Sequence, residues 1–244
     1  MAFQSVFKRY ELKYLITLDQ KQKILSAMAP YMELDGFGRS SIRNIYYDTD
    51  NYLLIRRSVD KPVYKEKLRI RSYGRAASDG KVFVELKKKY QSVVYKRRIA
   101  MAQNVALGWL SGDNECPTCT QISREIDYFA AFYKSLHPAM FISYEREAYY
   151  SKDGGDLRVT FDDNILCRQD NLTLDSDVCG TPILPDGRVL MEIKCSGGMP
   201  LWMTEVLSRE RIYKTSFSKY GTAYKQIIFP QLFNSHITEA ANYD

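Results

Sequence analysis

The chain has 244 residues, 45% of them hydrophobic, and carries 35 lysines and arginines against 29 aspartates and glutamates. This length and apolar content exclude an unfolded chain and suit one large globular domain. The formal charge of +6 favours an anionic partner, and the five scattered cysteines argue against a disulfide framework.

The beginning of the chain, MAFQSVFKRYELKYLI, shows no apolar stretch followed by a small-residue cleavage site. No later run approaches the roughly 20 consecutive apolar residues of a membrane helix. We therefore expect a cytoplasmic protein without a membrane segment of its own, which could export a product only through a membrane partner protein.

Alternation of apolar and polar residues predicts strands, and helical periodicity predicts helices. The strands are expected at residues 6–16, 41–48, 63–73, 81–90, 92–101, 139–150, 156–162 and 188–195. The helices are expected at residues 18–32, 50–59, 103–111, 121–136, 200–211 and 218–232. Asp19 is a candidate cap for the first helix, and turn signals such as DGFG separate the elements.

Like charges alternate along the segment KEKLRIRSYG, residues 65–74. In a strand Lys67, Arg69 and Arg71 would lie on one face, and the apolar residues between them on the other. The same alternation recurs in other strands, where it groups on one face Glu11, Lys13, Glu85, Lys87, Lys89, Lys96, Arg98, Tyr144, Arg146, Arg158, Glu192 and Lys194. Any single strand of this kind could have an ordinary solvent face. The repetition over strand after strand favours a shared cationic surface.

Eight strands can close into a barrel. The predicted fold class is therefore α+β: a closed antiparallel eight-stranded β-barrel, or tunnel, with a polar cationic interior and helices packed outside. No linker or change in composition divides the chain, so we expect a single domain over residues 1–235 and a flexible tail at 236–244.

Neighbouring cations repel one another in a protein interior, so such a tunnel must hold water, carboxylates or a polyanion. Arginine and lysine are both suited to phosphate oxygens. Duplex nucleic acid is too wide for a small barrel, and single strands would need aromatic platforms, whereas Tyr10 and Tyr14 fall on the apolar face. The common glycine-rich nucleotide motifs are absent from the sequence. We expect a chain of phosphates and no nucleic acid.

Cys116 and Cys119 form a C-x-x-C in ECPTCT, and His137 and His236 are the histidines of the chain. A structural zinc site normally needs a second pair of ligands. A surface loop with free thiols is the simpler interpretation, and the scarcity of histidine also weakens any histidine-based catalysis.

Nine short segments resemble, in the same order, those of the VTC-domain polyphosphate polymerases of the triphosphate tunnel metalloenzyme superfamily. They are YELKYLI, SIRNIYYDT, KLRIRSYG, VFVELKKK, YKRR, SYER, RVTFDDNI, MEIKCSGGMP and SFSKYGTAY, between about residues 7 and 230. The resemblance implies a polymerase that transfers the terminal phosphoryl group of ATP to a growing polyphosphate chain. It also implies ATP and polyphosphate or pyrophosphate as partners, with Mn²⁺ or Mg²⁺ as cofactor.

The resemblance also assigns roles to residues of this chain. The catalytic cations would be Lys13, Arg69, Arg71, Lys87, Lys96 and Arg146. The residues that bind further phosphates would be Tyr144, Ser218 and Lys219, and the alternation adds Arg158 and Lys194. The resemblance makes Glu192 the metal ligand, and Glu85 is a second candidate for metal or for ion pairing with the lysines.

Two positions depart from the patterns of the relatives that the chain resembles. Hydrolytic relatives begin with E-x-E-x-K, whereas Arg9, Glu11 and Lys13 stand here, which points away from a hydrolase. Ser216 stands where the fungal polymerases carry a lysine. Three alternatives stay open: a triphosphate or polyphosphate hydrolase, a non-catalytic polyphosphate-binding module, and a cyclase acting on ATP.

Overall fold

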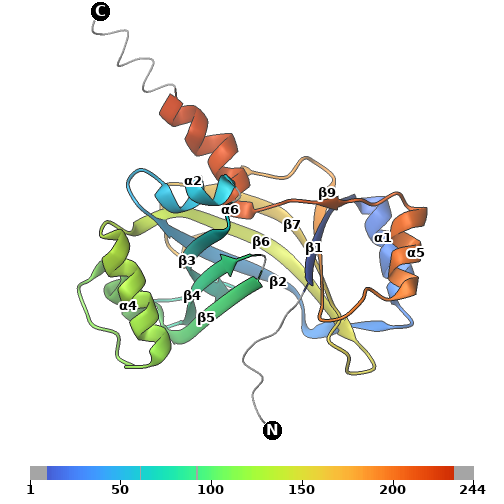
Figure 1. The fold of residues 1–244 in the computed structure, drawn as a ribbon, viewed down its shortest axis with the longest axis horizontal. Helices are drawn as coiled ribbons and strands as arrows, with labels where there is room; N and C mark the ends of the chain where they lie inside the picture. Colours follow the sequence, from blue (N-terminus) through green and yellow to red (C-terminus); the bar gives the residue numbers. More distant parts are fainter. Residues whose placement is uncertain (1–9, 61, 92, 234–244) are drawn as a thin grey trace, which may run out of the picture.

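The computed structural model describes residues 10–233 except 61 and 92 (Figure 1). Its strands are β1 Tyr10–Thr17, β2 Met32–Asp48, β3 Tyr64–Tyr73, β4 Lys81–Tyr90, β5 Val93–Ala102, β6 His137–Ser151, β7 Arg158–Arg168, β8 Thr181–Pro182, β9 Arg188–Cys195 and β10 Lys214–Thr215. Its helices are α1 Leu18–Met28, α2 Leu53–Val59, α3 Gln103–Ser111, α4 Gln121–Tyr133, α5 Leu201–Arg209, α6 Lys219–Ala223 and the π-helix η1 Tyr224–Ile228.

The prediction of a closed eight-stranded barrel is wrong. The described residues form one antiparallel sheet of ten strands in the order β10-β1-β9-β7-β6-β2-β3-β4-β5, with β8 paired to β7. The outer edge of β1 pairs with the two-residue strand β10, so β5 stays at the opposite edge of the sheet. Alternation predicts which face a side chain occupies, but it does not predict whether the two edge strands pair with each other.

Most strand positions were predicted, and the errors have local causes. β9 coincides with the predicted segment 188–195, but β2 begins at Met32 and runs through the turn signal DGFG. Its pairing with β6 shifts register between Leu34 and Arg39, and Gly38 has φ +59°, so the glycines of DGFG lie in a β-bulge within the strand. Strands of two residues, such as β8, are too short to show alternation.

Some helices also differ from the predicted ones, because their ends depend on contacts that the sequence pattern does not specify. Thr17, and not Asp19, caps α1: its Oγ1 accepts from the Gln20 amide at 3.1 Å, and the Gln20 side chain accepts from the Thr17 amide at 3.0 Å. The predicted helix 218–232 is interrupted by η1 and is helical again over 229–233. The expected start of the first strand at 6–9 and the tail at 236–244 lie outside the described residues.

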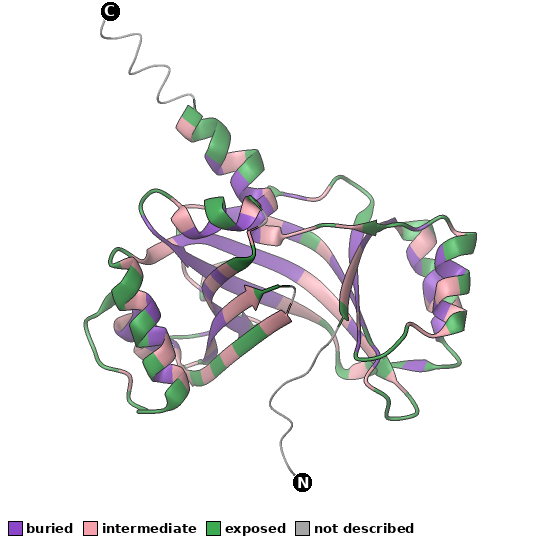
Figure 2. Cartoon of the chain, in the orientation of Figure 1, coloured by how far each residue is buried: buried purple, intermediate pink, exposed green. Residues whose placement is uncertain are grey.

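The sheet curls strongly, and its concave face carries the charged side chains together with a core cluster around Tyr46 and Tyr220. Lys87 on β4 lies 3.4 Å from Glu11 on β1, although five strands lie between β4 and β1 in the sheet order. The apolar residues that alternate with the charged ones along β3 point to the other face. There Leu68 and Ile70 pack in one core cluster with residues of α3 and α4. A second core cluster lies under α1 and α5, at the other end of the molecule (Figures 1 and 2).

The C-terminal segment packs against the concave face itself. Tyr220 stacks on Tyr46 with ring centroids 4.9 Å apart, and its hydroxyl donates to Asp48 at 3.0 Å. The same carboxylate accepts from the first amides of α2, including Leu54 at 2.8 Å. This packing carries the residues just before α6 to the concave face (Figure 1). In the described part of the chain, no helix is long and apolar enough to cross a membrane.

Candidate functional site

The site is built on two rows of side chains that cross β3, β4 and β5 on the concave face. In the first row Arg69 lies opposite Glu85, and Glu85 lies opposite Arg98. In the second row, two residues along each strand, Lys67 lies opposite Lys87 and Lys87 opposite Lys96. Alternation placed these residues on one face, and the strand register sets them side by side.

Glu85 is the centre of the first row and is 1% exposed. One carboxylate oxygen accepts from Arg69 Nε at 2.9 Å and Nη2 at 2.7 Å, and the other accepts from Arg98 Nε at 2.7 Å. Lys96 Nζ also lies 2.7 Å from Glu85. Burial would raise the pKa of this carboxyl, but Arg69, Arg71 and Lys96 hold it well below its usual range. Both oxygens of Glu85 are therefore occupied by cations.

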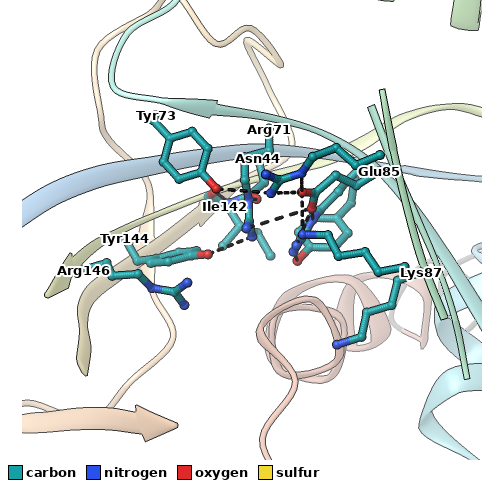
Figure 3. A network of polar contacts seen from close by, with 12 residues as sticks. Asn44, Arg71, Tyr73, Glu85, Lys87, Ile142, Tyr144 and Arg146 are labelled. Atoms are coloured by element: carbon teal, nitrogen blue, oxygen red, sulfur yellow. Dashed lines mark hydrogen bonds and ion pairs between the residues drawn. The ribbon is translucent and has the colours of Figure 1, made fainter. Parts of the chain in front are cut away.

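Arg71 extends the network towards β2 and β6 (Figure 3). Its Nε donates to Asn44 Oδ1 at 2.9 Å, and its Nη2 donates to the Tyr144 hydroxyl at 3.0 Å. Tyr144 also has Lys219 Nζ at 4.1 Å from its ring centroid. Burial opposes ionisation of Tyr144, but Arg71, Arg146 and Lys219 outweigh it and lower the pKa to about 8.

Asp162 on β7 holds a second group of cations. It is buried and accepts from Arg146 Nε at 2.6 Å and Nη2 at 2.7 Å, in a bidentate pair. Lys219 Nζ donates to the same carboxylate at 2.5 Å. Burial opposes ionisation, but these two cations lower the pKa of Asp162. The two ion pairs of Asp162 therefore connect β6 and the start of α6 to β7.

A third group of charges lies on β1 and β9. Lys194 Nζ is 2.7 Å from Glu192 Oε1, whereas Lys13 Nζ is 3.6 Å from Glu192 Oε2 and 3.4 Å from Glu11. Lys13 also donates to the carbonyl of Phe217 at 3.1 Å. Burial opposes ionisation of Glu192, but Lys194 and Lys13 lower its pKa.

Lys67 connects β3 to the C-terminal segment. Its Nζ donates to Ser218 Oγ at 2.8 Å. Burial and the positive charges of Lys87, Lys65 and Lys13 lower the pKa of Lys67 to about 7. Lys96 is affected in the same direction, and burial together with Arg69 and Arg98 lowers its pKa to about 8 despite Glu85.

The structure brings nearly all of the predicted site residues into these networks. Arg158 is the exception, because it is exposed at the start of β7, where it lies opposite Lys194 in the register. Sequence reasoning placed Glu11 on the cationic face but assigned no role to Asp162 or Asn44. Asp162 continues the alternation of Arg158 on β7, and Asn44 and Asp162 both lie within the short segments that carry the family resemblance.

The donor set of the concave face decides where a divalent metal fits. Among the described residues no group of three or more histidine, cysteine or carboxylate side chains could hold a metal ion. Glu192 and Glu11 lie near each other, because the negative charge of Glu192 acts to raise the pKa of Glu11. The contact between Glu192 Oε2 and Lys13 Nζ, at 3.6 Å, is too long for a hydrogen bond. Two carboxylates with further oxygens from phosphate and water suit Mn²⁺ or Mg²⁺. Glu85 fits less well, because cations occupy both of its oxygens.

Cys116 and Cys119 lie between α3 and α4, and neither is in a disulfide. The neighbouring residues of α3 and α4 pack on the outer face of the sheet, in the same core cluster as Leu68. The cysteine pair is therefore separate from the cationic site.

A model of the VTC domain family matches residues 8–228 of the chain. The chain belongs to the VTC domain family. The resemblance seen in the short sequence segments is thus confirmed at the level of the family. None of the curated proteins compared with this VTC domain matches it.

Several solved structures share the fold of this VTC domain. A protein from Bacillus halodurans, provisionally described as an adenylate cyclase, has a TM-score of 0.54 at 14% identity and covers 88% of this chain and 96% of its own. A protein from Hippeastrum, provisionally an adenylyl cyclase with a dominant triphosphatase activity, has a TM-score of 0.53 at 14% identity, covering 88% and 94%. A protein from Vibrio parahaemolyticus has a TM-score of 0.51 at 12% identity, covering 90% and 98%. At these identities the likeness shows the fold alone.

Proposed function

We propose that this VTC domain is an ATP-dependent polyphosphate polymerase, which transfers the terminal phosphoryl group of ATP to a growing polyphosphate chain on its concave face. The cations of that face support the proposal most strongly. Carboxylates neutralise them only in part, since the lysine row of β3, β4 and β5 has no carboxylate between its members. A chain of phosphates would supply the missing negative charge.

In the proposed reaction, an oxygen at the end of the polyphosphate chain attacks the γ-phosphorus of ATP. The bond between that phosphorus and the β,γ-bridging oxygen breaks, and ADP leaves. The attacking oxygen is already ionised at neutral pH, so no general base is required. The carboxylates of the face suit this chemistry: Glu11, Glu85, Asp162 and Glu192 all have a lowered pKa and are weak bases.

The barrier to this reaction is mainly the repulsion between two polyanions, and positioning with charge stabilisation supplies most of the catalysis. Arg69, Arg71 and Arg146 would clamp phosphate oxygens from β3 and β6. Lysines would neutralise the transferred group from the neighbouring strands: Lys13, Lys87 and Lys96. Further phosphates would contact Tyr144, Arg158, Lys194, Ser218 and Lys219.

Glu192, together with Glu11, would hold the Mn²⁺ or Mg²⁺ ion. When bound, the metal would supply positive charge that offsets the charge of the phosphates. Glu85 would act on the cations instead, because it keeps Arg69 and Arg98 in place through two hydrogen-bonded guanidinium groups.

The test is to incubate the protein with ATP and Mn²⁺ or Mg²⁺, stain the products for polyphosphate on a gel, and measure ADP and free phosphate. A metal-dependent ladder with matching ADP is expected. Free phosphate without polymer would indicate a hydrolase instead of a polymerase, and cyclic nucleotide with pyrophosphate would indicate a cyclase. Tight polyphosphate binding without turnover would indicate a binding module.

Glu192→Gln should lower polymer synthesis at least about 100-fold, because it removes the charge of the proposed metal ligand. The matched control is Glu205→Gln on the exposed side of α5, which should retain wild-type activity. Circular dichroism should show the same fold for both variants. Full activity of a folded Glu192→Gln protein would contradict the proposed metal site.

A further inference from the structure

Lys67, Lys87 and Lys96 form a lysine row, in which each residue lies directly opposite the next across β3, β4 and β5. Like charges directly opposite one another destabilise a sheet. The adjacent row avoids this cost, because Glu85 stands between Arg69 and Arg98. The lysine row has no such intervening carboxylate.

The three lysines differ in how their charge is balanced. Lys96 lies 2.7 Å from Glu85, and Lys87 lies 3.4 Å from Glu11. Among the ion pairs of the described residues, Lys67 has no carboxylate partner, and its Nζ donates to the neutral Ser218 hydroxyl at 2.8 Å. The described carboxylates therefore balance the charge of Lys96 and Lys87 but not that of Lys67.

The groups that face Lys67 are themselves mostly cations. Lys65 and Arg69 flank it on β3, Lys87 faces it from β4, and Lys13 faces it from β1. From the C-terminal segment, Ser218 Oγ accepts hydrogen bonds from Lys67 and from the Gly221 amide, the latter at 3.1 Å. The hydroxyl hydrogen of Ser218 is thus available to donate to an incoming oxygen.

We infer that Lys67 is a substrate-binding residue, which with Lys87 and Ser218 forms a subsite for one phosphate group of a linear polyphosphate or of a nucleoside triphosphate. This inference rests on the proposed function and adds a residue to its binding site. A phosphate at this subsite receives charge-assisted hydrogen bonds from the two ammonium groups and one from the hydroxyl. It also removes the repulsion along the row, so the subsite is more favourable occupied than empty.

The inference is tested by titrating inorganic tripolyphosphate into the protein by calorimetry, without metal and without turnover. Lys67→Met should weaken binding at least about tenfold, the effect of losing a hydrogen bond to a charged group. Without ligand it should melt at a higher temperature than the wild type, because a repelling charge is removed. Lys67→Gln should behave in the same way. The control is Lys88→Met, one residue from Lys87 on the opposite face, where Lys88 lies 3.8 Å from Glu66.

The outcomes separate this inference from the proposed function. If the wild type binds tripolyphosphate and both Lys67 variants bind it within about twofold of the wild type, the Lys67 subsite is overturned and the proposed function stands. If binding weakens but both variants melt at a lower temperature, Lys67 is structural and the subsite is also overturned. If the wild type does not bind tripolyphosphate at all, both the proposed function and the Lys67 subsite are contradicted.

Discussion

Glu85 shows how a single buried carboxylate organises the concave face. Burial would raise its pKa, yet Arg69, Arg71 and Lys96 keep it ionised. Its negative charge stands where cations from β3 and β5 would otherwise repel one another. A buried charge of this kind is costly alone and is stabilised by its partners, so the residue and its cations must be considered together.

Glu85→Gln should lower the free energy of unfolding by about 3–5 kcal/mol at pH 7, because it leaves buried cations uncompensated. The folded-state pKa of Glu85 is lowered from 4.5, so its stabilising effect is present above that value and is lost as the pH falls through the lower folded-state pKa. The wild type and the variant should therefore converge in stability in acid.

Urea unfolding followed by circular dichroism at pH 7 and at successively lower pH measures this difference, with Glu205→Gln as the control. A loss below about 1 kcal/mol at pH 7, or a gap that stays constant in acid, would contradict this role for Glu85.

At the scale of elements, Asp162 connects three parts of the fold that are distant in sequence. From β7 it holds Arg146 on β6 and Lys219 at the start of α6. The C-terminal segment also packs through Tyr220 on Tyr46, but the Asp162 pair sits directly beside Tyr144 and its cations. Docking of α6 and the geometry of the candidate site therefore depend on the same carboxylate.

Asp162→Asn should loosen α6, because an amide cannot hold both cations. Hydrogen exchange of the amides in residues 219–228 should become at least about tenfold faster than in the wild type, which corresponds to a local loss of about 1.4 kcal/mol. The neighbouring Asp163→Asn is the control. Asp163 pairs with Arg39, whose side chain is 46% exposed, and such surface pairs contribute little. Equal exchange in both variants would exclude Asp162 as the anchor.

At the scale of the whole molecule, contacts between side chains bridge the concave face of the curled sheet. Lys87 reaches Glu11 of β1, and Lys67 reaches Ser218 of the C-terminal segment. The backbone does not join the edge strands β5 and β10 in the described part of the chain. The stability of this arrangement should therefore depend on the anions that occupy the concave face.

Inorganic tripolyphosphate should raise the melting temperature of the wild type. At 100 times its dissociation constant, a ligand that binds only the folded state adds about 2.7 kcal/mol. Because the attraction is electrostatic, the shift should shrink as sodium chloride is added. Differential scanning calorimetry at low and high salt measures both effects, and an absent or salt-independent shift would contradict an anion site on this face.

The sequence by itself determined most elements and the face on which each strand residue lies. The segment 188–195 was predicted and found as β9, and the alternation of Lys67, Arg69 and Arg71 placed all three on the concave face. Alternation is a local property, since successive side chains of any strand point to opposite faces. The resemblance of the short motifs added the family, which the match to the VTC domain confirms.

Only the tertiary structure decided that, within the described residues, the sheet stays open, which cations are neutralised and that Lys67 has no carboxylate partner. These properties depend on the register of the strands and on contacts between distant segments. Glu11 and Lys87 are 76 positions apart, and Lys67 and Ser218 are 151 positions apart. A residue type predicts that a charge needs a partner, but curl and register decide which partner lies within reach.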